Sequence, residues 1–127
     1  AILGVALVLF ISVNTSHAAV SVGTPTTSTA STFSFTSSGA GVLVLTSTIR
    51  TSSGTPTPTA TYNGVSMNVA KSYYCGFIEG ATIFYLNKPT AGTANIVVTA
   101  TNLAAIQSAA MDVTGIKGDV IGASDQN

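Results

Sequence analysis

Few side chains in this chain belong to the types that carry out acid–base or nucleophilic chemistry. The 127 residues include one histidine, His17, one cysteine, Cys75, and four acidic residues. His17 lies in an N-terminal segment that we interpret below as a secretory signal. Its removal would leave the serines and Cys75 without a histidine base and would also argue against a zinc site. The acidic residues form no catalytic motif, so we expect no catalytic residues and no enzyme activity.

Oxygen ligands for a metal ion are concentrated near the C-terminus. The segment KGDVIGASDQN contains Asp119, Asp125 and Asn127 on a glycine-rich stretch. Carboxylate and amide oxygens are the ligands that Ca²⁺ prefers, but the spacing does not follow the full D-x-[DN]-x-[DN]-G pattern. Two interpretations stay open, a calcium-binding loop and an ordinary solvated loop. We expect no other cofactor.

Three aromatic residues, Tyr73, Tyr74 and Phe77, lie close together in KSYYCGF. Exposed aromatic rings suit stacking against a ligand such as a glycan, so these residues form a candidate binding face. Core packing is the alternative, because alternation along a strand would bury at least two of the three. Cys75 lies among them and has no second cysteine with which to form an intramolecular disulfide. We expect it to be a small, buried or half-buried side chain, and pairing between chains is the alternative.

Composition excludes several classes of partner. Charged residues make up 6% of the chain and the formal net charge is zero. Nucleic acid and anionic membrane surfaces therefore have no basic patch to bind. Abundant Thr, Ser, Val and Ile favour strands over helices. The hydrophobic content of 46% argues against disorder of the whole chain.

The N-terminal segment is apolar and uncharged from residue 1 to residue 13. The small residues Ser16 and Ala18 follow at the spacing of a signal-peptidase site, which predicts a signal peptide over residues 1–18. A membrane-spanning helix needs about 20 apolar residues, more than this run provides. The alternative is that residues 1–20 are retained as an apolar helix that packs in a filament core, as in pilin-like proteins.

The rest of the chain has the pattern of an all-β domain. Residues 19–31 are small and polar and predict a flexible lead-in. Residues 32–127 contain strand-like runs separated by turn residues roughly every 8 to 12 positions. We therefore expect a single antiparallel β-sandwich of about seven strands, Ig-like or jelly-roll-like, after the N-terminal hydrophobic segment. VLVLTSTI is apolar on both faces at its start and predicts a central strand, whereas AAIQSAAMDVTG suits a helix or a strand and we favour the strand.

Two segments predict hairpins. Asn63-Gly64 is the preferred dipeptide of a type I′ turn. Placing Tyr62 opposite Val65 extends the pairing along one face, with the further pairs Ala60–Met67 and Pro58–Val69. In NKPTAGT, Pro89 presets the first corner of a turn and Gly92 can adopt a positive φ, so we expect a hairpin with Lys88 as a solvated flank.

In their order and spacing, the central strand VLVLTSTI, the two hairpin segments and the strand that ends in MDVTG resemble a Gly/Thr/Ser-rich β-sandwich module. This module is found in exported bacterial surface proteins and in phage tail or virion-associated proteins. The resemblance covers about residues 41–123. It rests on Tyr62, Asn63, Gly64, Val65, Met67, Tyr85, Leu86, Pro89, Ala91, Gly92, Val97, Val113, Gly115 and Ile116. It implies a sandwich and a secreted, cell-surface or virion-surface setting, but no catalytic residues. Members continue with further strands, which implies that this chain is a truncated or shorter module.

The sequence thus predicts a non-enzymatic, secreted or surface module with a structural or adhesive role. We expect it to bind a surface glycan, a cell-wall polymer or copies of itself. We expect no nucleic-acid partner, and no membrane contact unless residues 1–20 are retained. A pilin-like filament subunit is the main alternative, and a glycan-acting enzyme is the third class.

Overall fold

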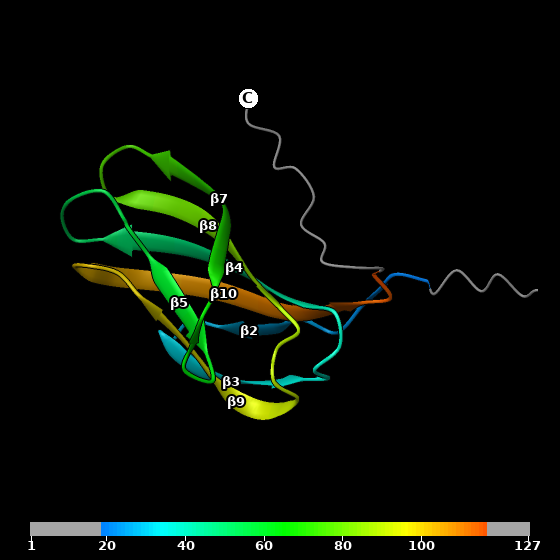
Figure 1. Cartoon of the computed structure of the whole chain (residues 1–127). Helices are drawn as coiled ribbons and strands as arrows, with labels where there is room; N and C mark the ends of the chain where they lie inside the picture. The colour runs from blue at the N-terminus through cyan, green and yellow to red at the C-terminus, as the bar shows by residue number, and fades with distance from the viewer. Residues whose placement is uncertain (1–18, 117–127) are drawn as a thin grey trace, which may run out of the picture.

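The computed structural model describes residues 19–116, which form ten β-strands in two sheets and no helix (Figure 1). The larger sheet contains, in spatial order, β1 (Ser21–Val22), β10 (Leu103–Thr114), β4 (Val42–Thr51), β8 (Glu79–Asn87) and β7 (Asn68–Cys75), with β2 (Thr26–Ser28) also paired to β10. The smaller sheet contains β3 (Thr32–Ser37), β9 (Gly92–Thr99), β5 (Thr59–Tyr62) and β6 (Val65–Ser66). All strand pairs are antiparallel, and the two sheets pack around one core, which confirms the predicted β-sandwich, with ten strands where about seven were expected.

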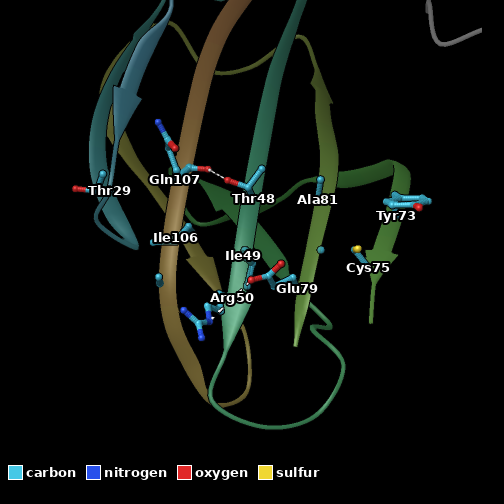
Figure 2. Close-up of a pocket in the computed structure, with 12 residues that line it drawn as sticks. Thr29, Thr48, Ile49, Arg50, Tyr73, Cys75, Glu79, Ala81, Ile106 and Gln107 are labelled. Atoms are coloured by element: carbon cyan, nitrogen blue, oxygen red, sulfur yellow. Dashed lines mark hydrogen bonds and ion pairs between the residues drawn. The ribbon is translucent and has the colours of Figure 1, made fainter. Parts of the chain in front are cut away.

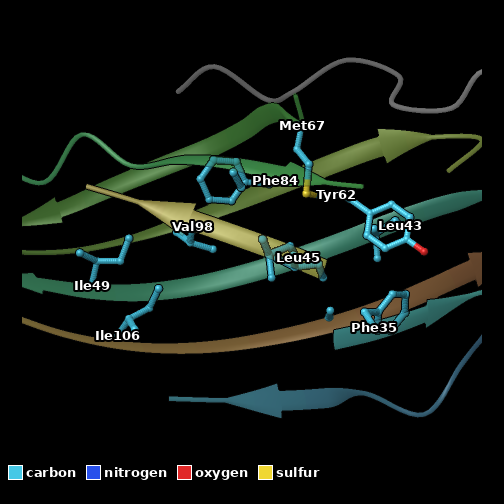
Figure 3. Close-up of a cluster of buried hydrophobic side chains, with 12 residues drawn as sticks. Phe35, Leu43, Leu45, Ile49, Tyr62, Met67, Phe84, Val98 and Ile106 are labelled. Atoms are coloured by element: carbon cyan, nitrogen blue, oxygen red, sulfur yellow. The ribbon is translucent and has the colours of Figure 1, made fainter. Parts of the chain in front are cut away.

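One face of each sheet is apolar, and these two faces pack against each other (Figure 3). Strand β4 lies centrally between β10 and β8, as predicted, and its side chains alternate between the core and the outside. Leu43 and Leu45 are completely buried, whereas Thr48 faces outward. Each such buried side chain stabilises the fold by about 1.5–3 kcal/mol. The core consists of Phe35, Leu43, Leu45, Ile49, Ala60, Tyr62, Met67, Phe84, Ile96, Val98, Ile106 and Ala110.

A row of hydroxyl groups crosses the inward face of the larger sheet. Ser28, Ser108, Ser47, Thr82 and Ser72 are successive register neighbours on β2, β10, β4, β8 and β7. The Ser47 and Ser108 hydroxyls share a buried hydrogen bond of 2.8 Å, and those of Ser72 and Thr82 share one of 3.0 Å. A slip of one residue would leave these buried groups without partners and turn apolar side chains to solvent. The row therefore helps to fix the register.

Residues 19–31, predicted as a flexible lead-in, instead add two short strands to the larger sheet. Ser21 pairs with Thr114 and Ser28 pairs with Ser108, both on β10. The Gly23 amide also donates to the Asp112 carbonyl at 2.8 Å. Strand β10 would otherwise be a long open edge, and these strands satisfy part of its backbone. The ambiguous segment before Gly115 is a strand, as favoured from the sequence.

The Asn63-Gly64 hairpin has the predicted register at its turn, with Tyr62 opposite Val65. Asn63 and Gly64 both have positive φ, 49° and 75°, as a type I′ turn requires. The Met67 amide still bonds to Ala60, but the predicted Pro58–Val69 pair does not form. The chain enters the larger sheet at Asn68, and Val69 pairs with Phe84 instead. Met67, which is buried in the core, is the residue at which the chain passes from β6 of the smaller sheet to β7 of the larger one.

The NKPTAGT segment is not the hairpin that we predicted. Strand β8 ends at Asn87 in the larger sheet, whereas β9 begins at Gly92 in the smaller one, so the segment crosses between the sheets. Lys88 is exposed and has φ of 49°, and its amide donates to the Gly41 carbonyl at 2.8 Å. Both edges of β8 are already paired, with β4 and β7, so β9 cannot pair with it and lies between β3 and β5 in the other sheet.

Gly41 and Gly54 form a matched pair for testing the fold, because their φ values are nearly equal at 75° and 76°. A Cβ at Gly41 would collide with the Val113 carbonyl oxygen, whereas a Cβ at Gly54 would meet no atom within 4 Å. We expect Gly54→Ala to lower the free energy of unfolding by about 1–2 kcal/mol through backbone strain alone. We expect Gly41→Ala to cost at least about 3 kcal/mol. Equal losses in urea denaturation would contradict the close approach of β10 to Gly41.

Tyr62 supports a second test, because its side chain is buried and makes a hydrogen bond. Its hydroxyl donates at 2.8 Å to the carbonyl of Gly92, the residue at which the connection from β8 to β9 ends. Burial raises the pKa of this phenol; the Ser37 backbone opposes the rise and the Asp112 carboxylate adds to it. We expect Tyr62→Phe to cost about 1 kcal/mol at neutral pH. Above about pH 10 the unfolded phenol ionises first, so wild-type stability falls.

The measurement is the unfolding free energy of both proteins at pH 7 and at about pH 10.5. Tyr62→Phe has no Tyr62 ionisation, so the stability difference should shrink at the higher pH. A difference that stays constant or grows would show that the native phenol ionises at least as easily as the unfolded one.

Candidate functional site

The outward face of the larger sheet carries the strongest candidate for a functional site. The residues that alternate with the core positions face outward and lie in register across four strands. Gln107, Thr48, Ala81 and Tyr73 form one such row, from β10 to β7. The adjacent row consists of Ala105, Arg50, Glu79 and Cys75.

These two rows form a trough of about 500 Å³ (Figure 2). Its short side chains are Thr48 and Ala81 on the two central strands and Ala105 on β10, and the longer Arg50 and Glu79 lie in the row beside Thr48 and Ala81. Figure 2 shows Thr29 on one flank and Tyr73 with Cys75 on the other. The lining consists of Thr29, Thr48, Ile49, Arg50, Tyr73, Cys75, Glu79, Gly80, Ala81, Ala105, Ile106 and Gln107.

The trough contains both hydrogen-bond donors and hydrogen-bond acceptors, and one side chain of each charge. Arg50 Nε lies 4.0 Å from Glu79 Oε1, and the two side chains are 62% and 59% exposed. An ion pair this exposed is weak, and its polar atoms remain accessible to a ligand. The Thr48 hydroxyl donates to the Gln107 backbone carbonyl at 3.3 Å, which leaves its lone pairs to accept. One positive and one negative charge cancel within the site.

The three aromatic residues predicted as a stacking face are all exposed, at 69% for Tyr73, 41% for Tyr74 and 81% for Phe77. The alternative interpretation, that core packing buries at least two of them, is therefore wrong. They do not share one surface. Tyr73 faces the trough, Tyr74 points to the other side of β7 and packs over Gly80, and Phe77 lies in the turn after the strand. Of the three, Tyr73 alone lines the trough.

Cys75 is also exposed, which contradicts the expected buried or half-buried position. It lies at the end of β7, at the open edge of the larger sheet, and pairs with Glu79 on β8. An edge strand has a neighbour on one side only, so its side chains receive less cover than the same residues would in a central strand.

Sequence reasoning did not find Thr48, Ala81 or Gln107. In the sequence these residues are only short or uncharged side chains at outward positions of strands. They can be recognised as one site only when the register shows that they lie side by side.

The acidic side chains of residues 19–116 do not share a site. Glu79 faces outward beside Arg50. Asp112 pairs with Leu43 on the inward side, and its carboxylate accepts hydrogen bonds from the Ser37 hydroxyl at 3.0 Å and the Ser38 amide at 2.7 Å. Asp112 thus ties β10 to the end of β3 and has a structural role.

Over the same residues, no three His, Cys, Asp or Glu side chains are grouped so that they could hold a metal ion. The calcium ligands considered from the sequence, Asp119, Asp125 and Asn127, lie outside the described residues, as does His17. The signal peptide or retained helix expected at residues 1–18 lies outside them too. Within residues 19–116 we find no helix long and apolar enough to cross a membrane.

Comparison with known proteins adds no relative. No protein-family model matches the chain, and neither a curated protein nor a solved structure is significantly similar to it. The resemblance to exported and virion-associated modules therefore stays a prediction, and the site has to be judged on its own geometry.

Proposed function

We propose that this chain is a non-enzymatic β-sandwich module of an exported surface protein, and that the trough on its larger sheet binds a neutral surface glycan or cell-wall polymer. The observation that carries this proposal is that the trough is lined by an exposed tyrosine ring and by polar side chains whose charges, on Arg50 and Glu79, cancel. Its volume of about 500 Å³ is within the range of small-molecule sites, and it holds a few sugar units of a longer chain.

The chemistry of the lining favours a sugar over other ligands. Sugar rings present a patch of C–H groups that suits the face of an aromatic ring, and Tyr73 provides that face at 69% exposure. Their hydroxyls both donate and accept. Arg50 donates, Glu79 and the Thr48 hydroxyl accept, and the Gln107 side-chain amide can do both. A strongly charged ligand would meet an unfavourable charge as well as a favourable one.

The placement of the carboxylates supports binding without hydrolysis. Most glycosidases hold two carboxyl groups about 5 to 9.5 Å apart on either side of the scissile bond. Here Glu79 faces the trough, whereas Asp112 belongs to the inward face of the sheet and is engaged by Ser37 and Ser38. Residues 19–116 contain no histidine to act in place of a second carboxylate.

An exported, surface-exposed setting is the second part of the proposal. It is supported by the apolar segment over residues 1–13 with its small-residue cleavage pattern, and by the low charge of the chain. The pilin-like alternative depends on residues 1–20, nearly all of which lie outside the described residues.

Binding to neutral oligosaccharides tests the proposal. The full chain is screened against an array that includes chitotetraose, cellotetraose and mannan fragments, and the best probe is titrated by calorimetry. We expect Tyr73→Ala to weaken binding about tenfold, which corresponds to the loss of one stacking contact. Ala81→Trp fills the middle of the trough and should abolish binding.

The matched controls are Tyr74→Ala and Phe77→Ala, which remove exposed aromatic rings that do not line the trough. Both should bind as the wild type does, and circular dichroism confirms that each variant is folded. Retention of no oligosaccharide by the wild type, or equal losses for Tyr73→Ala and Tyr74→Ala, would refute the proposed site.

A further inference from the structure

Strand β7 forms one edge of the larger sheet, and among the described residues it pairs with β8 alone. An open edge presents backbone N–H and C=O groups that can pair with another strand. Most of the exposed large apolar side chains of the described residues lie on β7, in the turn that follows it or on the neighbouring β8: Val69, Tyr73, Tyr74, Phe77 and Ile83. A free edge and an apolar border together mark an interaction surface.

The part of β7 that can pair with a further strand is short and well defined. A bulge between Val69 and Lys71 interrupts the ladder before it, and Gly76, with φ of 71°, turns the chain after it. Bulges of this kind end strand pairing at an edge. The regular edge therefore runs from Lys71 to Cys75, and its middle residue is Tyr73.

We propose that β7 pairs antiparallel with β7 of a second copy of this chain, with Tyr73 opposite Tyr73 on a two-fold axis. An antiparallel segment that pairs with itself over its whole length must be centred on its middle residue, which fixes the register without further assumption. Self-complementary contact of one patch is the form that two-fold dimers require. Addition of a strand at an open edge is a common recognition mode.

Charge favours this second copy as the occupant. In this register Lys71 of one copy lies opposite Cys75 of the other, and Glu79 of that other copy is the next residue in the same row. The backbones of Lys71 and this Glu79 are two strand spacings, about 10 Å, apart, a gap that the long side chains can bridge. The two-fold axis creates the contact twice. A parallel pairing would instead set Lys71 beside Lys71.

The dimer joins the two troughs. A two-fold axis perpendicular to the sheet keeps both outward faces on one side, so the Tyr73 walls of the two troughs meet at the axis. The pairing itself needs only the edge and does not depend on the proposed glycan function. If both hold, a polymer long enough to cross the axis gains affinity because it occupies two sites on one assembly.

Disulfide trapping tests the register. In the proposed dimer, Lys71→Cys lies opposite the native Cys75 of the second copy, at the 4.5–5.5 Å Cα spacing that a disulfide accepts. Mild oxidation of Lys71→Cys should give a covalent dimer. The two native Cys75 residues are four positions apart in this register, about 13 Å, so the wild type should cross-link far more slowly. Equal rates for the two proteins would overturn the proposed register.

Sedimentation velocity over a range of concentrations tests the dimer itself. A short edge contact is expected to give a weak, concentration-dependent dimer in the wild type. Tyr73→Lys places two like charges on the axis and should leave a monomer. Val22→Lys changes an exposed apolar residue on β1, at the opposite end of the same sheet, and should dimerise as the wild type does. A wild type that is monomeric at every concentration, or a Tyr73→Lys variant that still dimerises, would overturn the proposal, whether or not the trough binds oligosaccharides.

Discussion

Each sheet has a single apolar face, and the need to remove both faces from water by packing them together constrains the whole fold. Leu43, Leu45 and Phe84 of the larger sheet and Ile96 and Val98 of the smaller one are almost completely inaccessible to solvent. Burial on this scale is what offsets the entropy of ordering the chain, since residues 19–116 contain no pair of cysteines to form a disulfide. The same alternation that fills the core sends every second side chain outward, so the fold produces the outer surfaces as a consequence.

That constraint also explains which features the sequence could predict. Alternation identifies the central strand at Val42–Thr51, and the Asn63-Gly64 dipeptide identifies a tight turn, because both signals are local. Whether two successive strands pair or lie in opposite sheets is not local. The connection between Asn87 and Gly92 has the residues of a hairpin, yet it crosses the sandwich because both edges of β8 are already paired, with β4 and β7. Exposure at Cys75 follows from its place at a sheet edge, which no neighbouring residue reveals.

The candidate site also depends on which strands pair, and this cannot be found from neighbouring residues in the sequence. Thr48, Ala81, Gln107 and Tyr73 are far apart in the chain and meet only through the registers of β4 with its two neighbours and of β7 with β8. Only Tyr73 could be singled out from the sequence, because an aromatic residue is a recognisable ligand contact by itself. The trough and the open edge share that residue. One outward face can therefore provide both a ligand site and the contact between copies.

The larger sheet has one face in the core and the other open to solvent. This division can be measured as the rate of thiol labelling of single cysteines placed along β4 in a Cys75→Ser background. Thr48→Cys and Arg50→Cys should react at nearly the rate of the unfolded chain, whereas Ser47→Cys and Ile49→Cys should be strongly protected. Protection that does not alternate between neighbouring positions, or that is strongest at Thr48→Cys, would contradict the division into a buried and an open face.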